Sequence, residues 1–339
     1  MYVLIDGEPV FPNADGIYSI SEGEHAVTLT DVPTEALKEV YVSADGTGDG
    51  LSPANPTTIE NVINFIEDGA TVYVVGEIGD YTVNRYPIGS TEKAINFVGF
   101  DENSAFVAKT VFHLKGKTSF SNISFKVADL NSDSFSFYCE DGIGDDITFG
   151  ENVTLPEYTN NGFFPIIQPN TTNTLTINSG NFKNYILAGG WANSQADTNT
   201  TVTVNGGYVP GIAVARGWNN GSIFTGTFDF NVNDGKVDTI VLGHMAPFAR
   251  TNEGTYKAII NGGEVGTVYT GPINTELNGK GVRVLEINGG SVSEVKSRGG
   301  SAGTTTTKTV AIFNNGMAQN INSISENIDT IIKASVGGK

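Results

Sequence analysis

A short phrase that ends in glycine returns at near-constant intervals through the second half of the chain. It consists of an apolar residue, an asparagine, a small or polar residue and the glycine. Its copies span residues 177–180, 204–207, 232–235, 260–263, 287–290 and 313–316. The closing glycines are separated by 26 to 28 residues. A repeat of this length predicts stacked, near-identical units, as in a solenoid.

The apolar position of the phrase can be followed upstream, where Phe97, Phe120 and Phe149 precede Ile177 at steps of 23, 29 and 28 residues. Each step leaves room for about three short strands joined by turns. Within a coil, apolar residues alternate with polar ones, which predicts strands with one inward face. The residues expected to stack inward are Val202, Val204, Val209, Ile212 and Val214 in one coil, and Leu285, Ile287, Val292 and Val295 in another. We therefore predict an all-β fold.

The chain before the repeat divides into two parts. Residues 1–38 predict a small β domain or a fragment of a β-sandwich, with a hairpin over residues 2–10 whose turn is Asp6-Gly7. A strand over residues 40–42 and a turn rich in Gly and Asp follow. Apolar residues at helical spacing then predict an amphipathic helix at about 57–68, capped by Thr57 or Thr58. A further strand is expected from residue 71.

This order of strand, turn, amphipathic helix and strand resembles the opening of the pectate-lyase-like right-handed parallel β-helix superfamily. The resemblance covers roughly residues 39 to 335 and implies a right-handed parallel β-helix over 39–339, with the helix covering the first coil. Pectate-cleaving members imply a basic residue beside Ca²⁺-binding acids. Only Arg216 is suitably placed here, and no matching acidic group accompanies it. The catalytic residues therefore stay unknown.

Composition narrows the classes of partner. Lys and Arg total 19 against 37 Asp and Glu, a formal charge of −18, which disfavours nucleic acid and anionic membrane surfaces. No apolar run approaches the roughly 20 residues that span a bilayer, so we expect no membrane insertion. Cys139 is the single cysteine, which excludes a disulfide framework and a cysteine zinc site. The chain begins in strand-like sequence at Met1 and shows no capping helix after Ile332. We therefore expect a piece of a longer exported protein, secreted or attached to the cell surface.

Two polar features have a structural interpretation that we favour over a ligand site. The asparagines of the phrase are expected to hydrogen-bond amide to amide along the rod, as identical stacked side chains do. Acidic turns could hold Ca²⁺, although solvated turns explain them better. They contain Asp45, Asp49, Asp80, Asp141, Asp145 and Asp146. No cofactor is required by any motif.

The coils stop being alike eight to eleven residues after each glycine. Trp191 and Trp218 share one offset in adjacent coils, and Arg216 and His244 share another. Because loops on a rigid scaffold concentrate binding residues, we interpret this ridge as a sugar platform. The alternative is that both indole rings cover the apolar stack. The candidate ligand-binding residues are Trp191, Arg216, Trp218, His244, Tyr269 and Arg298.

These observations favour a bacterial-type surface module with a carbohydrate-recognition or adhesive face, whose partner is a polysaccharide or glycan. A second hypothesis is a polysaccharide-active enzyme, either a glycoside hydrolase or a lyase, which needs two convergent carboxylates. The acids near the ridge are Asp197, Asp229, Asp238, Glu253, Glu264 and Glu276. A third hypothesis is a structural spacer in a large adhesin or fibre.

Overall fold

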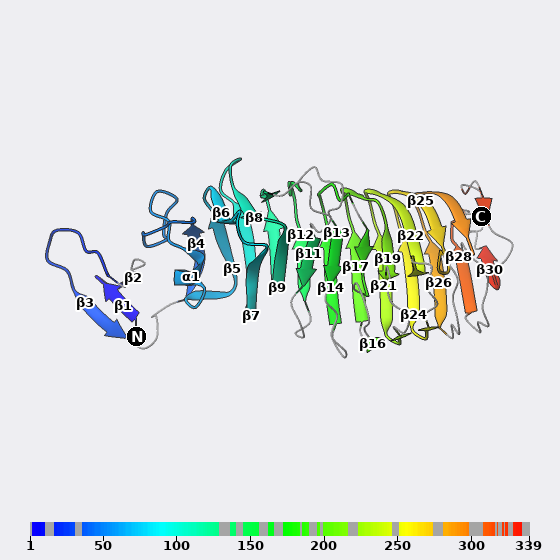
Figure 1. Cartoon of the computed structure of the whole chain (residues 1–339), viewed down its shortest axis with the longest axis horizontal. Coiled ribbons are helices and arrows are strands. Elements are labelled where there is room, and N and C mark those ends of the chain that lie inside the picture. The colour runs from blue at the N-terminus through cyan, green and yellow to red at the C-terminus, as the bar shows by residue number, and fades with distance from the viewer. Residues whose placement is uncertain are drawn as a thin grey trace, which may run out of the picture.

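The computed structural model describes residues 2–10, 17–30, 36–128, 136–139, 145–155, 162–165, 172–183, 185–189, 195–196, 199–215, 223–245, 251–273, 281–297, 308–315, 317, 321, 323–324 and 328–333. Over these ranges the chain is a parallel β-solenoid of about 8 turns that is 2% helical. Its strands lie side by side along a rod, with the N-terminal strands at one end and β30 at the other (Figure 1). The all-β solenoid predicted from the repeat is confirmed.

Two long sheets run along the rod and meet at the turns that carry the repeated phrase. The first sheet contains β4 (Leu37–Val42), β5 (Ile66–Val74), β7 (Arg85–Gly99), β9 (Val111–Ser121), β12 (Asp146–Phe149), β14 (Thr172–Ile177), β17 (Asn199–Val204), β21 (Thr227–Val232), β24 (Thr255–Ile260), β26 (Val282–Ile287), β28 (Lys308–Phe313) and β30 (Thr330–Lys333). The second sheet contains β11 (Ser136–Cys139), β13 (Gly162–Pro165), β15 (Ile186–Leu187), β18 (Tyr208–Val209), β19 (Ile212–Ala215), β22 (Lys236–His244), β25 (Glu264–Tyr269), β27 (Ser291–Lys296) and β29 (Ser323–Ile324). The long strands β7 and β9 belong to both sheets, and they pass from the second sheet into the first ahead of the phrase position, between residues 90 and 95 of β7 and between residues 114 and 117 of β9.

Two shorter sheets complete the coils. One is formed by β6 (Glu77–Asp80), β8 (Ala105–Ala108) and β10 (Ser124–Val127) in the early coils. The other is formed by β16 (Gln195–Ala196), β20 (Ile223–Phe224) and β23 (Thr251–Asn252) in the middle coils. All pairing between coils is parallel among the described strands, as a solenoid requires.

The register of the first sheet matches the prediction from the phrase. Phe97 pairs with Phe120, Phe120 with Phe149, and Phe149 with Ile177. The row continues without a slip through Val204, Val232, Ile260, Ile287 and Phe313. Since a one-residue slip would turn every inward side chain outward, the phrase fixes which residues form the core.

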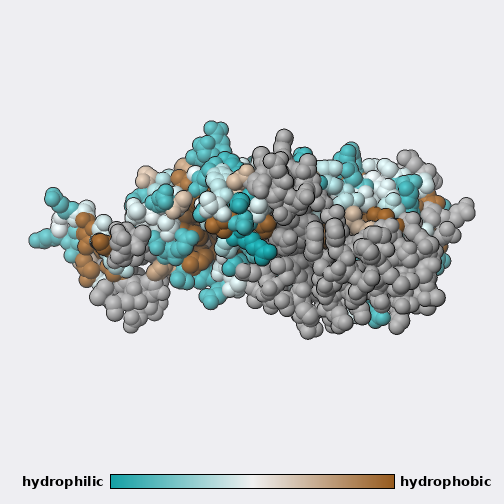
Figure 2. All heavy atoms as spheres, in the orientation of Figure 1, coloured by the Kyte–Doolittle hydropathy of each residue, from teal (hydrophilic) through white to brown (hydrophobic). Residues whose placement is uncertain are grey.

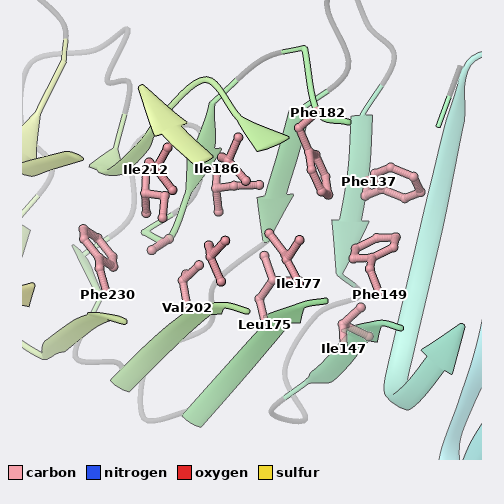
Figure 3. Packing of buried hydrophobic residues seen from close by; sticks show 14 of the residues in the cluster. Phe137, Ile147, Phe149, Leu175, Ile177, Phe182, Ile186, Val202, Ile212 and Phe230 are labelled. Atoms are coloured by element: carbon pink, nitrogen blue, oxygen red, sulfur yellow. The ribbon is translucent and has the colours of Figure 1, made fainter. Parts of the chain in front are cut away.

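The core is a continuous apolar stack between the two sheets. Every residue predicted to face inward in the coils around 204 and 287 is at most 1% exposed. In the early coils the stack is aromatic, with ring centroids 5.8 Å apart between Phe97 and Phe120 and between Phe120 and Phe149. Figure 3 shows side chains of the two sheets, such as Phe149 and Phe137, facing one another across this core.

The asparagines of the phrase form the predicted ladder. From Asn205 onward, each side-chain amide donates to the Oδ1 of the asparagine one coil earlier, over 2.6 to 2.9 Å. The ladder comprises Asn178, Asn205, Asn233, Asn261, Asn288 and Asn314. Gly207, Gly235, Gly263 and Gly290 follow at φ between 71° and 82°, a backbone conformation that favours glycine. The row is therefore a structural corner.

The predicted helix at 57–68 is wrong in its extent. The structure has one helical turn, α1 (Ile59–Val62), capped by Thr58. Residues from Ile66 onward form β5, whose start pairs with Leu37 of β4. The β-branched residues of this segment favour strand, and the Lys93 ammonium ends the turn by donating to the carbonyls of residues 63, 64 and 66. No helix among the described residues is long and apolar enough to cross a membrane.

The N-terminal residues form a separate antiparallel sheet of β1 (Tyr2–Ile5), β2 (Glu8–Val10) and β3 (Val27–Thr30). Asp6 and Gly7 make the predicted turn, with φ of 55° and 90°. At the other end, β30 pairs with β28, and its Ile331 and Ile332 are 38% and 46% exposed.

Candidate ligand-binding surface

The structure describes only part of the predicted ridge. Trp191, Arg216, Trp218 and Arg298 lie outside the described residues. His244 ends β22 and Tyr269 ends β25, so these two lie on neighbouring strands of the second sheet. The site can therefore be built from the ends of β19, β22, β25 and β27.

The shared offset of Arg216 and His244 does not give their register. Ala213 pairs with Val241, but Ala215 pairs with His244, so β22 contains one extra residue between these pairs. The shift lies between Val241 and His244, a stretch that includes Gly243, where an added Cβ would be 2.8 Å from the Pro272 nitrogen. A bulge of this kind re-aims the side chains that follow it. His244 is thus aligned with Ala215, which corrects the prediction.

His244 lies inside the end of the sheet. Its side chain is buried, with the residue 3% exposed. In the next coil Thr270 is fully buried and donates from its hydroxyl to the carbonyls of Lys296 and Ser297, over 3.1 and 3.2 Å. The structure therefore places His244 beneath the surface, away from the solvent-facing position expected for a sugar contact.

Tyr269 belongs to a row on the outer face of the second sheet. Leu187, Ala213, Val241, Tyr269 and Lys296 pair in register along successive coils. Their chain neighbours on the N-terminal side all belong to the main core; these are Ile186, Ile212, Ile240, Val268 and Val295. Successive strand residues point to opposite faces, so the Tyr269 row faces outward.

Part of this outward row is nevertheless buried. Leu187, Ala213 and Val241 are 0% exposed and form a second, smaller apolar cluster. The residues packed against them are Tyr185, Met245, Tyr269 and Ile273. We call these seven residues the outer apolar cluster. It gives the surface a rigid base, because Tyr269 packs on fully buried neighbours.

Charged groups lie beside the exposed side of Tyr269. The Lys296 ammonium is 5.6 Å from the centroid of the Tyr269 ring, and its Nζ is 2.6 Å from Oε2 of Glu294. The Thr267 hydroxyl is 3.5 Å from the same carboxylate oxygen. Hydrogen bonding to Glu294 raises the pKa of Lys296 above its usual range. The surface thus combines an aromatic ring with a fixed donor and a fixed acceptor.

The acids named near the ridge do not gather on one sheet. Asp229 lies on β21 of the first sheet, whereas Asp238 and Glu264 lie on β22 and β25 of the second. Asp238 accepts a hydrogen bond from the Tyr208 hydroxyl, which raises the pKa of Tyr208 to about 12. Glu253 is exposed. Asp197 and Glu276 lie outside the described residues.

Three carboxylates of the acidic turns accept hydrogen bonds from the protein itself. Asp49 accepts from the Leu51 amide, Asp80 from the Thr82 amide and hydroxyl, and the buried Asp145 from the Gly116 amide. Asp45 lies in the turn after β4, Asp146 is the first residue of β12, and Asp141 lies outside the described residues. In the described part of the chain, no three His, Cys, Asp or Glu side chains form a group that could hold a metal ion.

Sequence reasoning missed the outer apolar cluster, although the chain carries a signal for it. Alternation predicts a polar outward residue between two inward apolar ones. Residues 186–188, 212–214 and 240–242 are instead unbroken apolar runs. Such runs are typical of strands buried on both faces.

Comparison with protein-family models, with curated proteins and with solved structures gives no match for this chain. The coarse fold, a parallel β-solenoid, therefore rests on the strand pairing described above.

Proposed function

We propose that this chain is an exported or cell-surface, bacterial-type module. It recognises a polysaccharide or glycan, or uses that carbohydrate as the target for adhesion. The binding surface is the outer face of the second sheet at the ends of β22, β25 and β27. On this proposal the solenoid is right-handed and pectate-lyase-like, α1 is its N-terminal cap, and β1–β3 belong to a small β domain.

The observation that carries the proposal is the pairing of Tyr269 with the Lys296–Glu294 ion pair on a rigid sheet. A sugar ring offers C–H groups on its faces and hydroxyls at its edge. The aromatic ring supplies an apolar surface with a polar tip, while Lys296 donates and Glu294 accepts charge-assisted hydrogen bonds. Trp191 follows β15 in the sequence, Arg216 and Trp218 follow β19, and Arg298 follows β27. These four residues are proposed to extend the surface.

The buried base beneath Tyr269 favours recognition as well. Leu187, Ala213 and Val241 are fully buried members of the same row, and Tyr269 packs against their cluster, so Tyr269 is held in place before a ligand arrives. A site that needs little ordering loses less entropy on binding. An outward strand row is more often polar and solvated, and the buried row here marks this side of the rod as different from the first sheet.

A glycan array probed with the intact protein tests the proposal. We expect defined glycans to bind, and Tyr269→Ala and Trp218→Ala each to weaken binding about tenfold or more, the loss expected for an aromatic anchor. Tyr41→Ala is the matched control, because Tyr41 is a half-buried tyrosine on the first sheet, stacked on Tyr73. Absence of any glycan ligand would contradict the proposal and favour the structural spacer.

A polysaccharide-active enzyme is the second candidate, and Asp229 is the observation that favours it. This half-buried carboxyl lies in register with Lys257 on the outer face of the first sheet. Burial raises the pKa of Asp229, and Lys257 opposes that shift. Lys257 also lies 3.6 Å from Glu286 in the following coil. A carboxyl whose pKa is raised by burial suits a general acid, and Glu286, two coils further on beyond Lys257, is the second carboxyl proposed for this candidate.

Turnover separates the two candidates. The protein is incubated with plant and mucin glycans, with and without Ca²⁺, and new reducing ends and unsaturated-uronate absorbance are measured. The enzyme predicts product formation that Asp229→Asn abolishes. Asp238→Asn is the control on the second sheet and is expected to keep the activity. Binding without products would favour recognition alone.

A further inference from the structure

The single turn of α1 leaves a cavity at the first coil of the solenoid. The first half of β7 pairs with β9 on one side. On the other side α1 and the residue after it supply Ile59 and Ile63, which pack against the core. A four-residue turn covers less of the open core than a strand or a long helix, and a space remains beneath it.

The walls of this space are apolar and fixed. Ile78, Ile88, Phe97 and Phe106 belong to the buried core and form its floor. The cavity volume is ≈ 220 Å³. An apolar protein cavity of about 150 Å³ is large enough to accommodate a benzene molecule. Hydrophobic surface is visible around α1 and the first strands in Figure 2.

The remaining lining residues include three with polar side chains, Glu60, Tyr86 and Lys115. Glu60 is exposed and marks the side that opens to solvent. Burial, followed by the charges of Glu60 and Asp80, raises the pKa of Tyr86 to about 12. The hydroxyl of Tyr86 therefore stays protonated at neutral pH and keeps its ability to donate a hydrogen bond.

We propose that this cavity is a binding site for a small molecule with a single aromatic ring and one polar substituent, of the phenol class. The ring lies on the floor formed by Phe97 and Phe106, and the substituent reaches the lining that carries Tyr86. This site lies at the first coil, far along the chain from the surface around Tyr269, and does not depend on the proposed glycan function.

The size and the chemistry of the cavity select this class. Empty apolar space forfeits the dispersion contacts of its lining, which a ring of matching size restores. A sugar would place hydroxyls against Ile78, Ile88 and the two phenylalanines, where they find no hydrogen-bond partner, and this is costly. A long alkyl chain would exceed the volume.

The probe is p-cresol, titrated into the intact protein by calorimetry and by aromatic-methyl NMR. We expect a dissociation constant on the order of 0.1–1 mM, typical for a ligand of this size. Ile63→Trp should fill the cavity and weaken binding at least tenfold. Ile259→Trp is the matched control, a half-buried isoleucine on the outer face of β24, and should leave the affinity unchanged.

A second variant keeps the test decisive if Ile63→Trp does not fold. Tyr86→Phe removes the hydroxyl while keeping the ring. It should weaken p-cresol several-fold and leave toluene unchanged, because toluene has no polar substituent. Failure of both p-cresol and toluene to bind the wild-type protein, or full p-cresol affinity in a folded Ile63→Trp variant, would overturn the proposal.

Discussion

The side-chain amide of Asn205 donates a hydrogen bond to Oδ1 of Asn178, one coil earlier, over 2.8 Å. Asn233 repeats this bond to Asn205, and Asn261 repeats it to Asn233, each over 2.8 Å. An interior member of the ladder therefore donates one bond and accepts another. This links the corners of successive coils independently of the backbone pairing.

Removal of one ladder member should destabilise the solenoid. Asn233→Ala loses a donated and an accepted bond, and we expect the free energy of unfolding to fall by about 1–2 kcal/mol. Urea unfolding measures the change. Asn231→Ala is the control two residues earlier, on the outer face of β21, and should cost less. Equal losses in the two variants would show that the ladder adds nothing beyond the loss of an asparagine.

Most of the solenoid could be predicted because a parallel stack repeats its environment at each coil. The same inward position recurs from Phe97 to Phe313, so its spacing in the sequence gives the strand register. The Asn-Gly corner recurs for the same reason. A repeated sequence pattern therefore predicts strand register well wherever each coil packs on a similar neighbour.

The ridge could be predicted less well because its coils are not alike. A single extra residue near Gly243 shifts His244 against Ala215, which an offset counted from the glycine cannot show. The length of α1 was also mispredicted, since helical spacing of apolar residues in a short β-branched segment does not exclude a strand. The cavity beneath α1 follows from that shortness and has no sequence pattern of its own.

The corner glycines should tolerate no side chain. Gly263 has φ of 71°, and an added Cβ would be 2.6 Å from the Gly235 carbonyl oxygen. Gly69 has φ of 83° with no atom within 4 Å of the added Cβ. We expect Gly69→Ala to cost about 1–2 kcal/mol from the backbone alone. Gly263→Ala should cost about 1–3 kcal/mol more through overpacking.

Thermal and urea unfolding of both glycine variants measure this difference. The backbone conformation is nearly the same at the two positions, so the comparison isolates the contact with the preceding coil. A Gly69→Ala variant as unstable as Gly263→Ala would indicate that backbone conformation accounts for the whole effect.

The N-terminal sheet should depend on pH through His25. Its Nδ1 lies 2.6 Å from Oδ2 of Asp6, while Oδ1 of Asp6 accepts from the Ala26 amide. The hydrogen bond raises the pKa of His25 and lowers that of Asp6. Nε2 lies 3.1 Å from the carbonyl oxygen of Ser21, so the imidazolium can donate from both nitrogens. These contacts indicate that the His25–Asp6 pair holds the N-terminal sheet together, rather than acting as a nucleophile and its base.

The signs of the two shifts define the pH window. The stability that His25 gives the folded state is fully present below its ordinary pKa of 6.5. It is lost as the pH rises through the raised pKa of the folded state. The stability that Asp6 gives the folded state is present above its ordinary pKa of 3.8. It is lost as the pH falls through the lowered pKa of the folded state. NMR titration of His25 should give a pKa above 6.5 that Asp6→Asn restores to the ordinary range. An unchanged pKa in Asp6→Asn would contradict this role of the pair.

A buried hydroxyl in the core offers a route to greater stability. Thr200 is 4% exposed and points to the same side of β17 as Val202 and Val204. Its Oγ1 has no hydrogen-bond partner in the part of the chain that the structure describes. Burial of an unpaired hydroxyl is unfavourable. Thr200→Val, which keeps the shape, should therefore raise the free energy of unfolding by about 1 kcal/mol.

Thr118→Val is the matched comparison for this prediction. Thr118 is also buried, but its hydroxyl donates to the Lys115 carbonyl over 2.6 Å. Losing this bond should lower the free energy of unfolding by about 1 kcal/mol. Opposite shifts of the urea midpoint at a constant slope would show that pairing, rather than burial alone, sets the cost of a threonine in this core. Loss of stability in both variants would instead mean that the Thr200 hydroxyl is paired in the folded protein.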